Sequence, residues 1–103
     1  MVDTAPLDRP AKHTVLREFV RDVSAAAEAV LAALPGTRYG DLVVVQGDWW
    51  YRGEYRVAAQ GGASRVTLTI VNVAQSAHWS APIAGRRELA DAERAFDELL
   101  AAI

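Results

Sequence analysis

The stretch that decides the fold is Asp48-Trp49-Trp50-Tyr51-Arg52-Gly53-Glu54-Tyr55-Arg56-Val57, which holds two of the chain's three tryptophans and two of its three tyrosines. Its side chains alternate as in a strand. One face would carry Trp49, Tyr51, Gly53, Tyr55 and Val57, and the other Trp50, Arg52, Glu54 and Arg56. The first face is apolar and aromatic, and the second is charged apart from Trp50. This pattern predicts a strand of an antiparallel sheet with one covered side and one solvent-facing side.

Two further strands flank this stretch. Residues 42–46, Leu-Val-Val-Val-Gln, are rich in branched side chains, and residues 65–73 alternate between apolar and polar types. Gly61-Gly62, between the opening stretch and residues 65–73, is a strong turn signal. Residues 42–74 are therefore predicted to form a meander of three antiparallel strands.

The region before the meander is more ambiguous. Residues 14–21 contain branched and aromatic types that favour a strand, but their alternation is imperfect, so the buried face stays open. A helix from Thr14 through Leu34 is a competing interpretation. Ser24 is a suitable N-cap for a short alanine-rich helix over residues 25–34, which Pro35-Gly36 would end.

The last stretch predicts a long helix. Its apolar residues recur at spacings of three and four, and they are Leu89, Ala92, Phe96, Leu99, Leu100 and Ile103. A helix from Pro82 to Ile103 would be roughly 33 Å long, enough to cross the face of a small sheet. Gly85 weakens its first turns.

Composition narrows the class of protein. The 103 residues fit one domain, expected over residues 12–103, with residues 1–11 as a flexible tail. The net charge of −2 gives no basic excess to attract nucleic acid or anionic lipid. The chain has no cysteine and no apolar run long enough to span a membrane, and its first residues lack the basic start and apolar run expected of a signal peptide. These features predict a cytoplasmic protein, and the preference for arginine and alanine suggests a bacterial source.

The order of elements resembles the helix-grip fold of the START-related superfamily (SRPBCC) of polyketide cyclases and lipid-transfer proteins. Residues 19–30 look like that family's first strand running into its first helix. Residues 50–57 and 64–70 look like its central hairpin, and residues 94–100 like the end of its long helix. The resemblance implies an α+β helix-grip domain, with a twisted antiparallel sheet of about four strands against the C-terminal helix. The chain is shorter than most members.

The resemblance also implies a function. The first hypothesis is non-enzymatic binding of a small hydrophobic or aromatic molecule, such as a lipid or polyketide, between the sheet and the long helix. The second is a polyketide cyclase or dehydratase, with His78, Tyr51 or Arg17 moving protons or holding an oxyanion. The third is an interaction module without a cavity, which dimerises through an exposed strand or tryptophan surface.

The candidate ligand-binding residues are mainly aromatic. Aromatic side chains line apolar pockets, and a few polar groups orient the ligand. The set comprises Trp49, Tyr51, Tyr55, Asn72, Trp79, Phe96 and Arg17. Tyr55 and Phe96 also fit a plain core role. Trp50 falls on the charged face, where it could stack on Arg52 or mark an interface.

The sequence contains no recognisable catalytic or cofactor motif. His13 and His78 are the only histidines, and two such distant residues make a poor zinc site. His78 is the one acid–base candidate near a plausible pocket mouth. No catalytic residue, metal ligand or cofactor is predicted.

Overall fold

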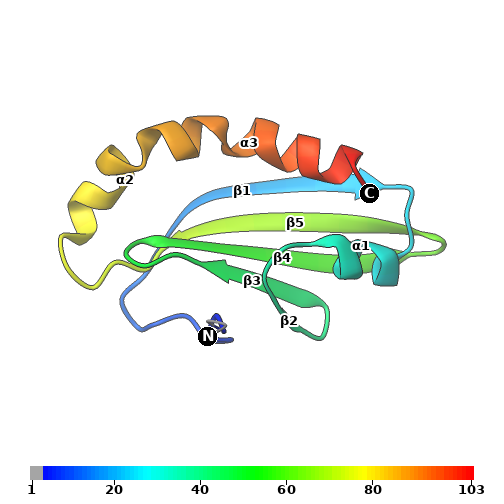
Figure 1. The fold of residues 1–103 in the computed structure, drawn as a ribbon, viewed down its shortest axis with the longest axis horizontal. Coiled ribbons are helices and arrows are strands. Elements are labelled where there is room, and N and C mark those ends of the chain that lie inside the picture. The colour runs from blue at the N-terminus through cyan, green and yellow to red at the C-terminus, as the bar shows by residue number, and fades with distance from the viewer. Residues whose placement is uncertain (1–3) are drawn as a thin grey trace.

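The computed structural model describes residues 4–103 as a five-stranded antiparallel sheet with helices on one face. The strands are β1 (Thr14–Val23), β2 (Thr37–Tyr39), β3 (Leu42–Gln46), β4 (Tyr51–Gln60) and β5 (Ala63–Asn72). The helices are α1 (Ala27–Ala33), the 3₁₀ turn η1 (His78–Ser80), α2 (Ala81–Ala84) and α3 (Arg86–Ala101). The spatial order of the strands is β1-β5-β4-β3-β2 (Figure 1).

The α+β class and the three-stranded meander are confirmed. β3, β4 and β5 pair in sequence, and the turn at Gly61-Gly62 joins Gln60 to Ala63. The described residues hold five strands rather than about four. The additional strand, β2, has only three residues and pairs with Leu42–Val44, so it is too short to show an alternating pattern.

The first strand is also confirmed, and the competing helix over Thr14–Leu34 is wrong. β1 pairs with β5 along its whole length, with an irregularity between Val15 and Arg17. This bulge shifts the alternation by one residue, which explains why the sequence pattern looked imperfect. Beyond it, Phe19 lies opposite Leu68 and faces the helices, whereas Val20 lies on the other side and is exposed.

Both helices begin differently from the prediction. α1 begins at Ala27 after Ala26, so Ser24 is not its cap. The single helix expected over residues 82–103 is divided at Gly85 into α2 and α3. The ring of Trp50 packs on Gly85, where an added Cβ would lie 2.2 Å from a ring carbon. Trp50 is therefore a buried core residue, and it neither stacks on Arg52 nor lies at a surface.

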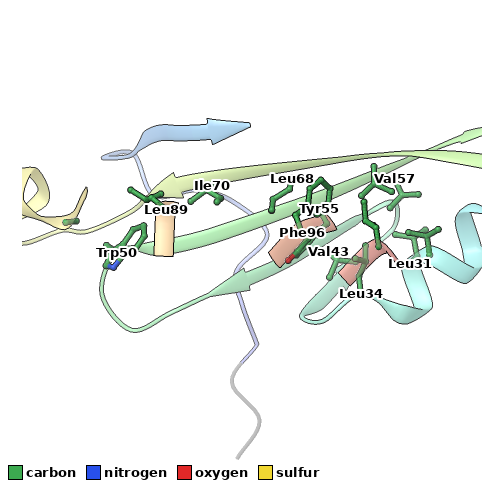
Figure 2. Close-up of a cluster of buried hydrophobic side chains, with 14 of the residues drawn as sticks. Leu31, Leu34, Val43, Trp50, Tyr55, Val57, Leu68, Ile70, Leu89 and Phe96 are labelled. Atoms are coloured by element: carbon green, nitrogen blue, oxygen red, sulfur yellow. The ribbon is translucent and has the colours of Figure 1, made fainter. Parts of the chain in front are cut away.

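The core lies between the sheet and the helices. Trp50 and Leu89 form one end, Tyr55, Leu68 and Phe96 the middle, and side chains of α1 the other end (Figure 2). α3 follows the β1 side of the sheet (Figure 1). The Phe96 ring lies between Phe19 and Tyr55, with ring centroids 6.5 and 6.1 Å apart.

The charged face of β4 is partly covered, which corrects the prediction of a fully solvent-facing side. The Arg52 side chain is completely buried and donates hydrogen bonds to the carbonyl oxygens of Pro6 and Leu7 at 2.7 and 2.6 Å. It also pairs with Glu54, as does Arg9. Burial opposes ionisation of Glu54, but the hydrogen bonds from the two arginines outweigh it and lower the pKa of that carboxyl.

Residues 5–9 therefore lie against the sheet on the side opposite the helices. The Tyr39 hydroxyl donates to the Ala5 carbonyl oxygen at 2.6 Å, which adds another anchor. The flexible tail over residues 1–11 stays a prediction, and residues 1–3 lie outside the described part. Within residues 4–103, no helix is long and apolar enough to cross a membrane.

Candidate functional site

A pocket of about 280 Å³ opens between the middle of the sheet and α3. Tyr51 and Tyr55 of β4 and Leu68 of β5 form its sheet side. Four residues of α3 line the opposite wall beside Phe96, and they are Glu88, Asp91, Ala92 and Ala95. The lining is thus aromatic and aliphatic inside, with two carboxylates on the helix. This is the location where the sequence predicts a ligand, between the sheet and the last helix.

Small residues on both elements shape this space: Gly53 makes room for the Tyr51 ring, and alanines of α3 line the opposite wall. Gly53 lies between Tyr51 and Tyr55 on the same face of β4, and an added Cβ would lie 2.9 Å from the Tyr51 hydroxyl oxygen. The Tyr51 side chain therefore folds over Gly53 along the strand. On the helix, Ala92 and Ala95 replace the larger side chains that would otherwise fill the gap. A glycine inside a strand signals such a close approach.

The two tyrosines are neutral hydrogen-bonding groups at physiological pH. Burial, with smaller contributions from Tyr55 and Glu88, raises the pKa of Tyr51 to about 12. Burial also raises the pKa of Tyr55. Each hydroxyl can therefore donate or accept a hydrogen bond, but neither is suited to act as a general base near pH 7.

Polar atoms in the pocket are left available for a ligand. Tyr55 is only 8% exposed, and its hydroxyl has no hydrogen-bond partner among residues 4–103. In the described residues, every side-chain nitrogen or oxygen that is fully buried has a hydrogen-bond partner. Because the Tyr55 oxygen has none, it is not fully buried. It is therefore reached from the pocket. Glu88 likewise forms no ion pair with another described residue, whereas Asp91 pairs with Arg94.

Three of the seven predicted ligand-binding residues meet in this pocket: Tyr51, Tyr55 and Phe96. The lining residues missed by sequence reasoning are Leu68, Glu88, Asp91, Ala92 and Ala95. Glu88 and Asp91 fall outside the apolar stripe of the last helix, and helical spacing alone does not show how far the pocket extends around that stripe. Gly53, on the aromatic face of β4, signals the close approach of the Tyr51 side chain but does not itself line the pocket.

The other four predicted residues lie outside the pocket. Asn72 is buried and structural, since its amide donates to the His78 carbonyl oxygen and its own oxygen accepts from the Ala74 amide. Trp49 donates to the Ser76 carbonyl oxygen, and Trp79 is 87% exposed. Arg17 is exposed and donates to the neighbouring Leu16 carbonyl oxygen.

His78 is also removed from the pocket. The residue is 5% exposed, with Nδ1 2.7 Å from the Ala74 carbonyl oxygen and Nε2 3.0 Å from the Thr14 hydroxyl. The carbonyl requires Nδ1 to donate, so in the neutral ring Nε2 accepts from Thr14. His13 is exposed and contacts the Pro10 carbonyl oxygen. Neither histidine lines the pocket, and residues 4–103 contain no cluster of three metal-ligating side chains.

Two of the other hollows, both larger, are weaker candidates. One of about 480 Å³ lies beside β3 and residues 4–6 and has no aromatic residue in its lining. Another of about 550 Å³ lies on the far side of α3 and is mostly lined by charged residues such as Arg21, Glu93 and Asp97, which pair with one another. Neither combines apolar walls with an unpartnered buried polar group.

Comparison with known proteins gives no relative: no family description, no curated protein and no solved structure matches the chain.

Proposed function

We propose that this protein is a non-enzymatic binding protein for a small hydrophobic or aromatic molecule, held in the pocket between β4, β5 and α3. The observation that carries the proposal is the pocket itself, in which Tyr51, Tyr55 and Phe96 meet with a free Tyr55 hydroxyl inside. Ligand sites are concave and mostly apolar, with a few polar groups that fix orientation. The helix-grip resemblance supports the same location.

The dimensions favour a compact ligand. A volume of about 280 Å³ lies near the lower end of the range for small-molecule pockets, about 300–1,000 Å³. It suits one or two fused rings, or the end of an acyl or polyketide chain, better than a whole lipid. Affinity would come from burial of apolar surface, at about 25 cal/mol per Å².

The binding proposal is favoured over the cyclase alternative by the surroundings of the polar groups. A general acid or base must reach the reacting atom and titrate near the working pH. His78 is engaged on both ring nitrogens away from the pocket, and the raised pKa of Tyr51 keeps its proton in place. The aromatic rings and tyrosine hydroxyls of the pocket are sufficient to hold and orient a bound molecule.

The test is calorimetric titration with the neutral probe 1-naphthylmethanol, whose fused rings match the pocket in size. The Ala92→Leu variant fills the pocket, so we expect its affinity for the probe to fall about tenfold or more. Ala90→Leu makes the same change on the exposed, opposite side of α3 and should bind like the wild type.

Thermal unfolding of both variants verifies that they fold. Absence of probe binding to the wild type, or equal binding by the folded Ala92→Leu and Ala90→Leu proteins, would refute the proposal.

A further inference from the structure

The charges around the pocket bear on the chemistry of its ligand. The lining contains two carboxylates, Glu88 and Asp91, and no lysine, arginine or histidine. Two neighbouring arginines on α3 lie outside this lining. Arg87, next to Glu88 in the chain, lines another hollow. Arg94 is tied to Asp91 and Glu98 on the other side of the helix. An anionic ligand would therefore meet repulsion without a compensating cation.

Glu88 is the carboxylate that remains free to act on a ligand. It forms no ion pair within residues 4–103, in contrast to Asp91, and its charge contributes to the raised pKa of Tyr51. Its field therefore reaches the Tyr51 hydroxyl inside the pocket. Glu88 is exposed to solvent but lines the pocket, and the low-dielectric walls beside it strengthen its attraction for a positive group relative to a carboxylate surrounded by bulk water.

The pocket interior is suited to the same kind of ligand. Three aromatic rings, those of Tyr51, Tyr55 and Phe96, surround the space, and their faces attract cations as well as apolar groups. The Tyr55 residue is nine-tenths buried, its hydroxyl is unpartnered and accessible from the pocket, and that oxygen can accept a hydrogen bond from an ammonium.

We propose that the ligand is an aromatic or apolar amine, bound with its rings among Tyr51, Tyr55 and Phe96 and its ammonium group at Glu88. This inference rests on the proposed binding function and narrows it, because it excludes fatty acids and other carboxylates as preferred ligands. Asp91 supplies weaker, partly neutralised attraction, since Arg94 pairs with it.

Three naphthalene probes of nearly equal size test the inference: 1-naphthylmethylamine, 1-naphthylmethanol and 1-naphthoate. At neutral pH they are cationic, neutral and anionic. We expect the amine to bind about fivefold more tightly than the alcohol, and the naphthoate to bind more weakly than both. An exposed or half-buried ion pair contributes up to about 1 kcal/mol, which corresponds to this ratio.

The Glu88→Gln variant should remove most of the preference for the amine while keeping affinity for the alcohol. Glu98→Gln makes the same charge change on α3 outside the pocket lining and is the matched control. It should retain the preference.

The outcomes separate the two proposals. If the alcohol does not bind the wild type, the binding function itself fails. If the alcohol binds but the amine has no advantage, or if the advantage survives in Glu88→Gln, the binding function stands and the amine inference is overturned. Tighter binding of naphthoate would overturn it as well.

Discussion

Single residues decide the shape of the apolar core. Trp50 and Gly85 are far apart in the sequence, yet the Trp50 ring occupies the space that any side chain at position 85 would need. The helix breaks at this point into α2 and α3. Gly85 is therefore a contact residue, and its effect goes beyond the low helix propensity noted from sequence.

This contact predicts whether a substitution at position 85 raises or lowers the free energy of unfolding. Glycine to alanine in a helical region ordinarily stabilises by roughly 0.5–1 kcal/mol. We expect Gly85→Ala to destabilise by about 2 kcal/mol, because overpacking forces Trp50 or the backbone to move. Urea unfolding followed by tryptophan fluorescence measures the change.

Gly62→Ala is the control, since an added Cβ there has no atom within 4 Å. Its free energy of unfolding should stay equal or rise slightly. A Gly85→Ala protein more stable than the wild type would show that the contact with Trp50 is not as close as described.

At the scale of elements, the segment over residues 5–9 behaves as an added layer on the sheet. Its Pro6 and Leu7 carbonyls accept hydrogen bonds from the completely buried Arg52, and its Arg9 pairs with Glu54. A buried guanidinium that loses its acceptors costs free energy, because its hydrogen bonds to water are not replaced.

Deletion of residues 1–11 tests this role. We expect the truncated chain to lose about 2 kcal/mol or more of stability in urea unfolding, since Arg52 would lose two charge-assisted hydrogen bonds. The full-length Arg52→Met protein should lose less from the same truncation, because it has no guanidinium to leave unpaired. An unchanged midpoint after truncation of the wild type would instead support the flexible tail predicted from sequence.

The elements themselves show how far sequence reasoning extends. The meander over residues 42–74 was predictable because each strand has a covered face and a clear turn beside it. β2 was not, since three residues carry no periodicity, and the bulge in β1 obscured the alternation there. The break at Gly85 depends on Trp50, a partner that helical spacing along the chain cannot reveal.

The same limits apply to the pocket. Tyr51, Tyr55 and Phe96 could be chosen because aromatic residues shared one face of a strand or helix. Trp49, Trp79 and Arg17 are candidates by residue type alone, and the structure places them outside the pocket. Asn72 was on a plausible strand position, but its amide is used to fasten the η1 turn. The type of a residue indicates whether it could contact a ligand, whereas its place in or outside the pocket depends on how elements distant in the sequence pack together.

At the scale of the whole molecule, a five-stranded sheet packs against helices on one face, and a pocket between β4, β5 and α3 presents tyrosine hydroxyls and carboxylates. The helix-grip relationship and a homodimer remain predictions. Trp79 and Ile83, exposed by 87% and 66%, would be the residues to examine in a dimer, in place of the buried Trp50. They do not line the pocket, so dimerisation there would leave ligand binding intact.

The most direct test of the central claim is to locate the probe by amide chemical-shift mapping, with ¹⁵N-labelled protein and 1-naphthylmethanol. We expect the largest shifts to cluster at Tyr51, Tyr55, Ala92 and Ala95, on the two walls of the pocket. Shifts confined to Gly36, Thr37 and Gly47, around the hollow beside β3, or no saturable shifts at all, would contradict it.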